Sequence, residues 1–308
     1  MQEEPFFSII VATYNQANLL KVCLDSIESQ TFGDWEAIIV NNHSTDNTSE
    51  VISSYKDPRI KEVFVHNDGV LSVSRNVGIK TACGKWICML DSDDVWYDKK
   101  LEMTYGAINA NPQMDVISHY LLLRNMNTDE TELMRTPNFS NDGIYIYLLR
   151  HGNIFPQTSL CYKKEFMDNN NLLFDESKNF VTSEDYDFSL RLALAGAKFY
   201  CIEVPLGEWR QYKNNWSSSP KHLGNLENML RHQVFDVQDI EEKRYKLWRD
   251  VSTGLIIRKS VLDIHEKHYL TGVGGFIKAL FKCPSRLFRY VSDRISLALS
   301  RIQYKQSL

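Results

Sequence analysis

The sequence predicts an α/β protein: a mainly parallel, Rossmann-like sheet flanked by helices, followed by a C-terminal helical extension. Two observations support this prediction. Over the first 120 residues, short apolar segments alternate with segments of helical spacing, and the loops between them are short. The last part of the chain shows helical patterns without strands between them. Strands separated by single helices are typical of a parallel sheet covered on both faces.

Four strands and three helices are expected in order along the first part of the chain. Apolar, β-rich runs predict strands at residues 6–11, 35–40, 60–65 and 85–90. Helical spacing of apolar residues predicts helices at 17–29, 47–55 and 72–82. Ser44, Thr45 and Asp46 offer an N-cap for the second of these helices.

The middle of the chain is less regular. A strand is expected at 114–123, a loop at 128–139, a helix at 186–195, and the last strands at 198–204 and 208–212. The Ser-, Pro- and Gly-rich segment 214–224 marks a boundary between a domain at 1–224 and an extension at 225–308. In the extension, residues 226–260 and 284–304 are expected to form helices, with glycine-rich residues 272–275 as a flexible joint.

The net charge of −4 hides an asymmetry along the chain. Residues 243–308 contain 14 Lys and Arg against four Asp and Glu, a net charge of +10, so residues 1–242 carry −14. No apolar run reaches the roughly 18 residues of a membrane-spanning helix, and the acidic N-terminus does not resemble a signal peptide. The six cysteines form no CxxC pair, so neither a zinc site nor a disulfide framework is expected, and the cytoplasm is the expected compartment.

Polar residues follow the predicted strands, and the ends of parallel strands are where ligands bind in such sheets. Asp91-Ser92-Asp93-Asp94 comes directly after the fourth strand. Three carboxylates within four residues repel one another, and Mg²⁺ or Mn²⁺ would relieve that repulsion while also binding substrate phosphates. The alternative is an acidic turn that caps the next helix.

Three further residues are candidates for chemistry. Glu184 and Asp185 stand at a predicted helix start, where they could cap the helix or act as a general base toward a hydroxyl. Arg75 lies near the same sheet edge and could bind phosphate. The sequence has no GxxxxGK[ST], GxGxxG or GxSxG motif, which disfavours P-loop NTPases, dinucleotide enzymes and α/β-hydrolases.

The basic C-terminal segment has an amphipathic pattern. It contains Lys and Arg together with apolar residues at helical spacing. These apolar residues are Leu287, Val291, Ile295, Leu299 and Ile302. Such a helix can lie in a membrane interface with its basic face toward anionic lipid. The alternative is a helix packed on the main domain with a solvated basic face. Nucleic acid is not expected as a partner, because the body is acidic and no aromatic stacking platform is visible.

Residues 6–220 resemble the family-2 glycosyltransferases with the GT-A fold. The resemblance rests on an ordered set of motifs: Ser8-Ile9-Ile10-Val11-Ala12-Thr13-Tyr14-Asn15, Gln30-Thr31-Phe32 before Trp35-Glu36, Ser44-Thr45-Asp46-Asn47-Thr48, Gly69 with Ser74-Arg75-Asn76, Leu90-Asp91-Ser92-Asp93-Asp94, and Ser183-Glu184-Asp185-Tyr186-Asp187 with Arg191.

The resemblance implies an inverting transfer of a sugar from a nucleotide donor to a hydroxyl of a glycan or lipid-linked glycan, in the synthesis of bacterial surface polysaccharide. Asp185 would be the catalytic base, with Glu184 beside it. Asp93, with Asp91, would bind Mn²⁺ or Mg²⁺ as the DxD motif. The donor-binding residues that it implies are Ala12, Thr13, Tyr14, Asn42, Arg75, Asp91 and Ser92.

Two positions depart from the family's pattern. Asn41-Asn42 stand where Asp-Asp is frequent, and the second residue commonly accepts a hydrogen bond from uracil. Asn42 can still accept and can also donate, so UDP is expected, with dTDP and GDP left open. Tyr212 stands where related enzymes often have a histidine metal ligand, so metal binding would rest mainly on Asp93.

Two alternative functions stay open at this point: a nucleotidyltransferase, which also needs acidic metal ligands near a nucleotide, and a decayed nucleotide-sugar-binding module. Acceptor contacts are expected around Phe155-Pro156-Gln157. The basic tail would hold the enzyme peripherally on the inner face of the plasma membrane, where lipid-linked acceptors reside.

Overall fold

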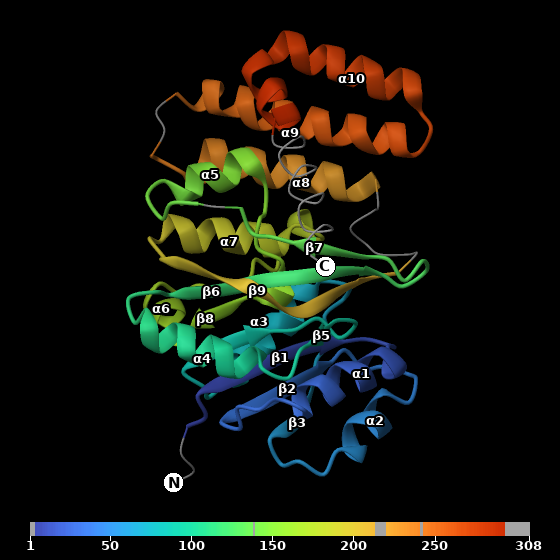
Figure 1. The fold of residues 1–308 in the computed structure, drawn as a ribbon, viewed down its shortest axis with the longest axis vertical. Coiled ribbons are helices and arrows are strands. Elements are labelled where there is room, and N and C mark those ends of the chain that lie inside the picture. The colour runs from blue at the N-terminus through green and yellow to red at the C-terminus, as the bar shows by residue number, and fades with distance from the viewer. Residues whose placement is uncertain (1–3, 138, 213–219, 241–242, 293–308) are drawn as a thin grey trace, which may run out of the picture. The chain divides into compact units, whose positions relative to one another are not determined.

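The computed structural model describes residues 4–137, 139–212, 220–240 and 243–292 (Figure 1). The chain divides into two compact units. The first is Met1–Leu148 with Asn153–Ser219, and the second is Leu149–Gly152 with Pro220–Leu308. The division into domains 1–224 and 225–308 stays a prediction.

The first half of unit one is a parallel sheet, as predicted. Its strands are β1 (Phe7–Thr13), β2 (Trp35–Asn41), β3 (Ile60–Phe64) and β4 (Trp86–Met89), and its helices are α1 (Ala17–Glu28), α2 (Thr48–Ser54) and α3 (Leu71–Thr81). The strands lie in the order β3-β2-β1-β4, and each neighbouring pair is parallel. All four predicted strands and all three predicted helices are confirmed.

The second half of unit one continues the same sheet with mixed pairing. Its strands are β5 (Val95–Trp96), β6 (Val116–Asn125), β7 (Thr131–Met134), β8 (Cys161–Lys163) and β9 (Phe199–Gln211). The helical segments are α4 (Lys100–Ala110), α5 (Ile144–His151), which runs into unit two, α6 (Lys164–Asn169), α7 (Glu184–Leu194) and the 3-10 turns η1 (Gln157–Ser159) and η2 (Lys178–Phe180). The full order is β3-β2-β1-β4-β8-β6-β9-β5, with β7 on β6. Only β6 and β9 are parallel here.

Two sequence predictions in this half were wrong. The expected loop at 128–139 contains β7, a short strand of two polar and two apolar residues that is held by its antiparallel pairing with β6. The two expected last strands are one strand, β9, which runs through Pro205 and Gly207 with shifts in its register to β6. A Cβ on Gly207 would come within 2.6 Å of the Val95 carbonyl oxygen, so this glycine lets β5 approach rather than breaking the strand.

The two faces of β1 pack against different helices. Ile9 and Val11 belong to the same buried cluster as Leu24 of α1. Ile10 points to the other face and meets α3, where an added Cβ on Gly78 would overlap Ile10 Cγ2. Alternate side chains of a strand face opposite sides of a sheet, and Gly78 lets α3 lie directly on one of them.

A disulfide links the two halves of the sheet, against the expectation from the sequence. Cys88 of β4 and Cys161 of β8 stand opposite each other in the antiparallel register and are bonded. The two cysteines are 73 residues apart, so no local spacing signals the pair. The side-chain nitrogen of Lys100 lies 3.0 Å from Cys161 Sγ and 3.7 Å from the Trp96 ring centroid. Burial lowers the pKa of Lys100 well below its ordinary value.

Unit two is helical, as predicted, but its helices are divided differently. They are α8 (Pro220–His232), a π-helical turn (Gln233–Val237), α9 (Arg244–His265) and α10 (Tyr269–Lys282). The single helix expected at 226–260 is therefore α8 and part of α9. The expected joint at 272–275 lies inside α10, where a Cβ on Gly272 would come within 2.5 Å of Ile264 Cγ1 of α9. These glycines thus serve close helix packing.

The last predicted helix, 284–304, is only partly covered. Residues 284–292 are helical, and the rest of that prediction lies outside the described residues. Within the part of the chain that is described, no helix combines the length and apolar character needed to cross a membrane.

The close approach of α3 to β1 can be tested with two glycine-to-alanine substitutions that should change the free energy of unfolding in opposite directions. Gly78→Ala should lower the free energy of unfolding by about 1–3 kcal/mol, because the methyl group overlaps the buried Ile10. Gly106→Ala, in α4, has no atom within 4 Å of the new Cβ and should raise it by about 0.5–1 kcal/mol through helix propensity. Urea denaturation measures both. Equal shifts in one direction would contradict the packing of α3.

Candidate functional site

The candidate site lies at the carboxyl ends of the parallel strands. The strand order reverses between β1 and β4, and a reversal of this kind is where ligands bind in open α/β sheets. The loop after β1 is tied to the loop after β2, because Asn15 N–H donates to Ser44 Oγ (3.0 Å) and Thr45 N–H donates to Asn15 Oδ1 (2.7 Å). Asn15 adopts a left-handed conformation (φ 51°) to make this junction.

The structure places the three predicted base-pocket residues at the end of β1 and just beyond it. Thr13 is buried and its carbonyl oxygen accepts the backbone N–H of Asn42, which joins the ends of β1 and β2. Ala12 is partly exposed, and Tyr14 follows with 54% of its surface exposed. The Tyr14 ring is therefore free to meet a planar ligand.

Asn41 and Asn42 hold loops in place. Asn41 is fully buried, donates to Glu62 Oε1 (2.7 Å) and accepts the backbone N–H of Ser44 (2.8 Å). Asn42 Oδ1 accepts the backbone N–H of Asn67 (3.0 Å), and this donor fixes which way the amide points. The amide nitrogen of Asn42 can donate to a ligand, and Oδ1 keeps a second lone pair that can accept.

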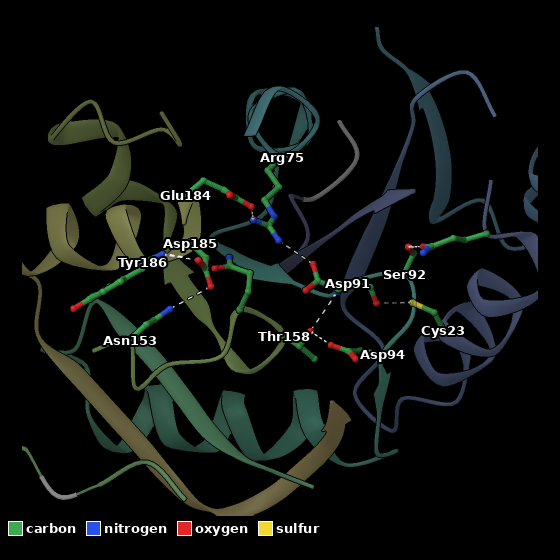
Figure 2. A network of polar contacts seen from close by, with 12 residues as sticks. Cys23, Arg75, Asp91, Ser92, Asp94, Asn153, Thr158, Glu184, Asp185 and Tyr186 are labelled. Carbon is green, nitrogen blue, oxygen red and sulfur yellow. Dashed lines mark hydrogen bonds and ion pairs between the residues drawn. The ribbon is translucent and has the colours of Figure 1, made fainter. Parts of the chain in front are cut away.

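The four residues that follow Leu90, just beyond β4, have separate environments. Asp91 forms an ion pair with Arg75 (Nη2 to Oδ1, 3.0 Å), and its side chain is 38% exposed. Ser92 donates to Gln16 Oε1 (2.5 Å), which ties the end of β4 to the start of α1. Figure 2 shows these contacts in one view. The backbone at Asp91 is thereby held against the helix that follows β1.

Asp93 and Asp94 differ in what they can bind. Asp94 is buried and accepts hydrogen bonds from the Thr158 hydroxyl and from the backbone N–H of Arg210 (2.9 Å), so it joins three parts of the fold. Burial, with a smaller contribution from Asp91, raises the pKa of Asp93 to about 6. The backbone N–H of Asp93 donates to its own carboxylate and opposes this rise. Asp93 therefore differs from Asp94, whose carboxylate joins other parts of the fold.

Arg75 connects the two acidic motifs (Figure 2). The guanidinium is buried and also pairs with Glu184 (Nη1 to Oε1, 3.1 Å). Burial alone would lower the pKa of Arg75, but Asp91, Glu184 and Asp185 raise it above its ordinary value. The second carboxylate oxygen of Glu184 is buried and accepts no hydrogen bond within the described structure. Arg75 thus holds residues from α3, the β4 end and α7 together.

Asp185 lies beside this ion pair. Burial raises its pKa, and the charge of Arg75 opposes that rise. One carboxylate oxygen accepts the backbone N–H of Tyr186 (2.7 Å), and the other accepts the side-chain amide of Asn153 (3.2 Å). Asn153 has no sequence signal that marks it, since it stands in a loop 32 residues away from its partner.

The segment expected to contact an acceptor is largely internal. Phe155 is fully buried and stacks on Phe199 at a centroid distance of 5.0 Å, and Gln157 is buried with its amide on the Tyr162 hydroxyl (3.0 Å). Asn153, just before this segment, is the residue that donates a hydrogen bond to Asp185.

The carboxylates of Asp91 and Asp93 suit a hard divalent cation that is also bound by the phosphates of a substrate. Among the described residues, no group of three or more His, Cys, Asp or Glu side chains is arranged to enclose a metal ion. However, Mg²⁺ and Mn²⁺ are often held by one or two carboxylates together with substrate phosphates. Asp93, whose pKa burial raises to about 6, and the half-exposed Asp91 provide that smaller set.

Removing Arg75 should lower the stability of the protein by an amount that depends on pH. The raised pKa values of Glu184 and Asp185 mean that the folded protein keeps protons that the unfolded chain releases, so stability falls as pH rises above the ordinary carboxyl range. Arg75→Met removes the charge that opposes both shifts. The loss in free energy of unfolding should grow between about pH 5 and pH 8, reaching about 3–5 kcal/mol.

Arg59→Met is the matched control for this measurement. Arg59 pairs with Asp57 at the surface, and the resulting low pKa of Asp57 keeps that carboxyl ionised above pH 5. Its loss should be about 1 kcal/mol and constant over the same pH range. Denaturation curves at several pH values compare the two variants, and a loss for Arg75→Met that does not change with pH would refute the arrangement.

Comparisons with known proteins agree with this geometry. Residues 8–182, more than half of the chain, match the family described as "Glycosyl transferase family 2". The chain is 26% identical over 325 residues to the poly(ribitol-phosphate) beta-N-acetylglucosaminyltransferase TarP of Staphylococcus aureus, covering 98% of this chain and 96% of TarP.

Two solved structures share the fold at low sequence identity. The crystal structure of S. aureus TarS 1-349 in complex with UDP superposes with a TM-score of 0.64 at 19% identity, covering 91% of this chain and 82% of that one. The mannosyltransferase PcManGT from Pyrobaculum calidifontis, in complex with GDP-Man and Mn²⁺, gives 0.59 at 16% identity, covering 97% and 81%. They confirm the predicted GT-A class. Together with the match over residues 8–182, this places the chain in glycosyl transferase family 2.

Proposed function

We propose that the protein is an inverting glycosyltransferase that moves a sugar from a nucleotide donor to a hydroxyl of a glycan or lipid-linked glycan. The observation that carries the proposal is the ion-pair bridge of Arg75, which gathers Asp91 and Glu184 beside Asp185. A transfer of this type needs positive charge at the leaving group and a base at the incoming hydroxyl. Both kinds of group are present within this cluster.

The nucleotide is assigned to the ends of β1 and β2. Ala12, Thr13 and the exposed Tyr14 would line the base and ribose, and Asn42 would donate from its amide nitrogen to a carbonyl of the base. UDP is the first choice, because a similar fold binds UDP in TarS. GDP, which PcManGT binds as GDP-Man, and dTDP are the other candidates.

The diphosphate is assigned to the end of β4. Arg75 would stabilise the negative charge that develops on the leaving diphosphate, and Asp91 with Ser92 would position the ribose and phosphate. Asp93, with Asp91, would hold Mn²⁺ or Mg²⁺. When bound, this cation neutralises charge on the phosphate oxygens.

Asp185 is assigned as the base. Its burial-raised pKa suits a group that must take a proton near neutral pH. The acceptor oxygen gives its proton to Asp185, forms a bond to the anomeric carbon and displaces the nucleoside diphosphate from the opposite side. Asn153 holds one carboxylate oxygen, and Glu184 holds Arg75. The displacement inverts the anomeric centre.

The acceptor is a polymer or a lipid-linked glycan of bacterial surface polysaccharide synthesis. The support is the likeness over nearly the full length to TarP, whose name describes transfer to poly(ribitol-phosphate). The basic C-terminal part would bring the enzyme to the inner face of the plasma membrane, as a peripheral protein.

Asp185→Asn tests the base. The variant should lower kcat by about 10²–10⁴-fold while donor binding is kept, because the amide cannot take the acceptor proton. Asp168→Asn is the control, since Asp168 is an exposed residue of α6 that pairs with Lys164. Release of nucleoside diphosphate from a panel of nucleotide sugars identifies the donor and measures the rate. Full activity of Asp185→Asn would instead favour a nucleotidyltransferase.

Asp93→Asn tests the metal assignment through stability rather than turnover. UDP with Mn²⁺ should raise the Tm of the wild type by about 3 °C or more at saturating concentration. The gain should be lost in Asp93→Asn and kept in Asp129→Asn, whose carboxylate lies on an exposed turn. Differential scanning fluorimetry provides the comparison. An absence of stabilisation with any nucleotide, in the wild type as well, would indicate a decayed site.

A further inference from the structure

Helix α10 runs beside α9 (Figure 1), and one face of α10 packs against α9. Gly272, Gly275 and Ala279 lie on this face, and Ala279 is completely buried. A Cβ on Gly272 would come within 2.9 Å of the Ser260 carbonyl oxygen, and one on Gly275 would overlap Ser260 Oγ. Small residues therefore bring α10 into direct contact with α9, and the orientation of α10 about its own axis is fixed.

The opposite face of α10 carries large apolar side chains in solvent. Leu270, Val273, Ile277 and Phe281, here called the outer stripe, are 93%, 51%, 52% and 83% exposed. Their spacing of three, four and four residues places them on one side of a helix with 3.6 residues per turn. Single exposed apolar residues are ordinary, but a continuous stripe of this kind marks an interaction surface.

The segment that contains the outer stripe carries charges of one sign. From Tyr269 to Ser292 the sequence contains no Asp or Glu. Lys278 and Lys282 border the stripe on α10, and Arg289 is exposed just beyond it. Burial lowers the pKa of Lys282, the charge of Lys278 lowers it further, and Glu227 of α8 opposes this only in part. A further anion, such as a lipid phosphate, would relieve the remaining repulsion.

These features select one occupant. The combination of bulky apolar side chains with flanking lysines and no acidic residue on the helix itself is that of a helix lying in a membrane interface. Helix α10 has 14 residues, and no described helix can cross a bilayer. A second copy docking through the same face would bring two positively charged surfaces together.

We propose that the outer stripe of α10 inserts into the interface of a membrane containing anionic lipid, with Lys278 and Lys282 contacting the headgroup phosphates. This deepens the peripheral attachment proposed above by naming the surface and the lipid chemistry, and it differs from the stripe expected at 287–302. It rests on that attachment and not on the assignment of the catalytic residues.

Vesicle flotation with the full-length protein tests the proposal. The wild type should float with vesicles rich in phosphatidylglycerol and much less with phosphatidylcholine alone. The double variant Leu270→Ser/Phe281→Ser should lower binding by about tenfold or more. Lys278→Gln/Lys282→Gln should lower binding to anionic vesicles by a similar factor and leave binding to neutral ones unchanged.

Tyr245→Ser is the matched control, because Tyr245 is 84% exposed on α9 and lies outside the outer stripe. Control binding equal to wild type, with weakened binding of both double variants, supports the proposal. Equal flotation of all four proteins, or no preference for anionic lipid, overturns it. So does a wild-type dimer that the stripe variant converts to a monomer, since the stripe would then join two copies.

Release of nucleoside diphosphate without vesicles separates this test from that of the catalytic proposal. All variants replace side chains outside the buried core, so they should fold and hydrolyse donor like the wild type. Unchanged hydrolysis with failed flotation removes the membrane inference alone. Flotation without any hydrolysis removes the catalytic proposal alone.

Discussion

The buried guanidinium of Arg75 is the interaction on which the candidate site depends. It reaches Asp91 at the end of the parallel half of the sheet and Glu184 at the start of α7, in the mixed half. A buried cation of this kind is stable only with close anionic partners, and buried carboxylates need the cation equally. The two halves of unit one are therefore held in one relative position by charge as well as by packing.

The same constraint explains the uneven roles of the carboxylates. Asp94 is satisfied by Thr158 and a backbone N–H, and Glu184 is committed to Arg75. Asp93 and Asp185 are not tied to Arg75 by an ion pair, and burial raises the pKa of each. A polar group with unspent hydrogen-bonding capacity in a buried setting costs stability, and such positions are kept where a ligand completes them. The chemistry proposed for the site uses these two carboxylates.

Local patterns carried much of the prediction, and distant partners account for what they missed. The alternation of apolar strands and amphipathic helices was enough to place β1–β4, the acidic residues after β4 and those at the start of α7. By contrast, the sequence did not show that Asp94 and Asp93 have different roles. The hydrogen-bond partner of Asp94, Thr158, is 64 residues away along the chain. The Cys88–Cys161 bond and the contact of Asn153 with Asp185 are also long-range. In α10, glycines that usually indicate flexibility proved to be packing residues, which only the facing helix reveals.

The separation of Arg75 from Glu184 along the chain also has a consequence for synthesis. The two residues are 109 positions apart, whereas β1–β4 and α3 are all made before position 90. During translation, the parallel half can assemble while Arg75 has only Asp91 as a partner, and domains generally acquire structure from the N-terminus onward. Burial of the arginine is complete only when α7 has left the ribosome. In a nascent chain that stops short of α7, the Arg75 guanidinium would therefore be solvated, whereas it is buried in the complete protein. This difference would distinguish incomplete chains from complete ones.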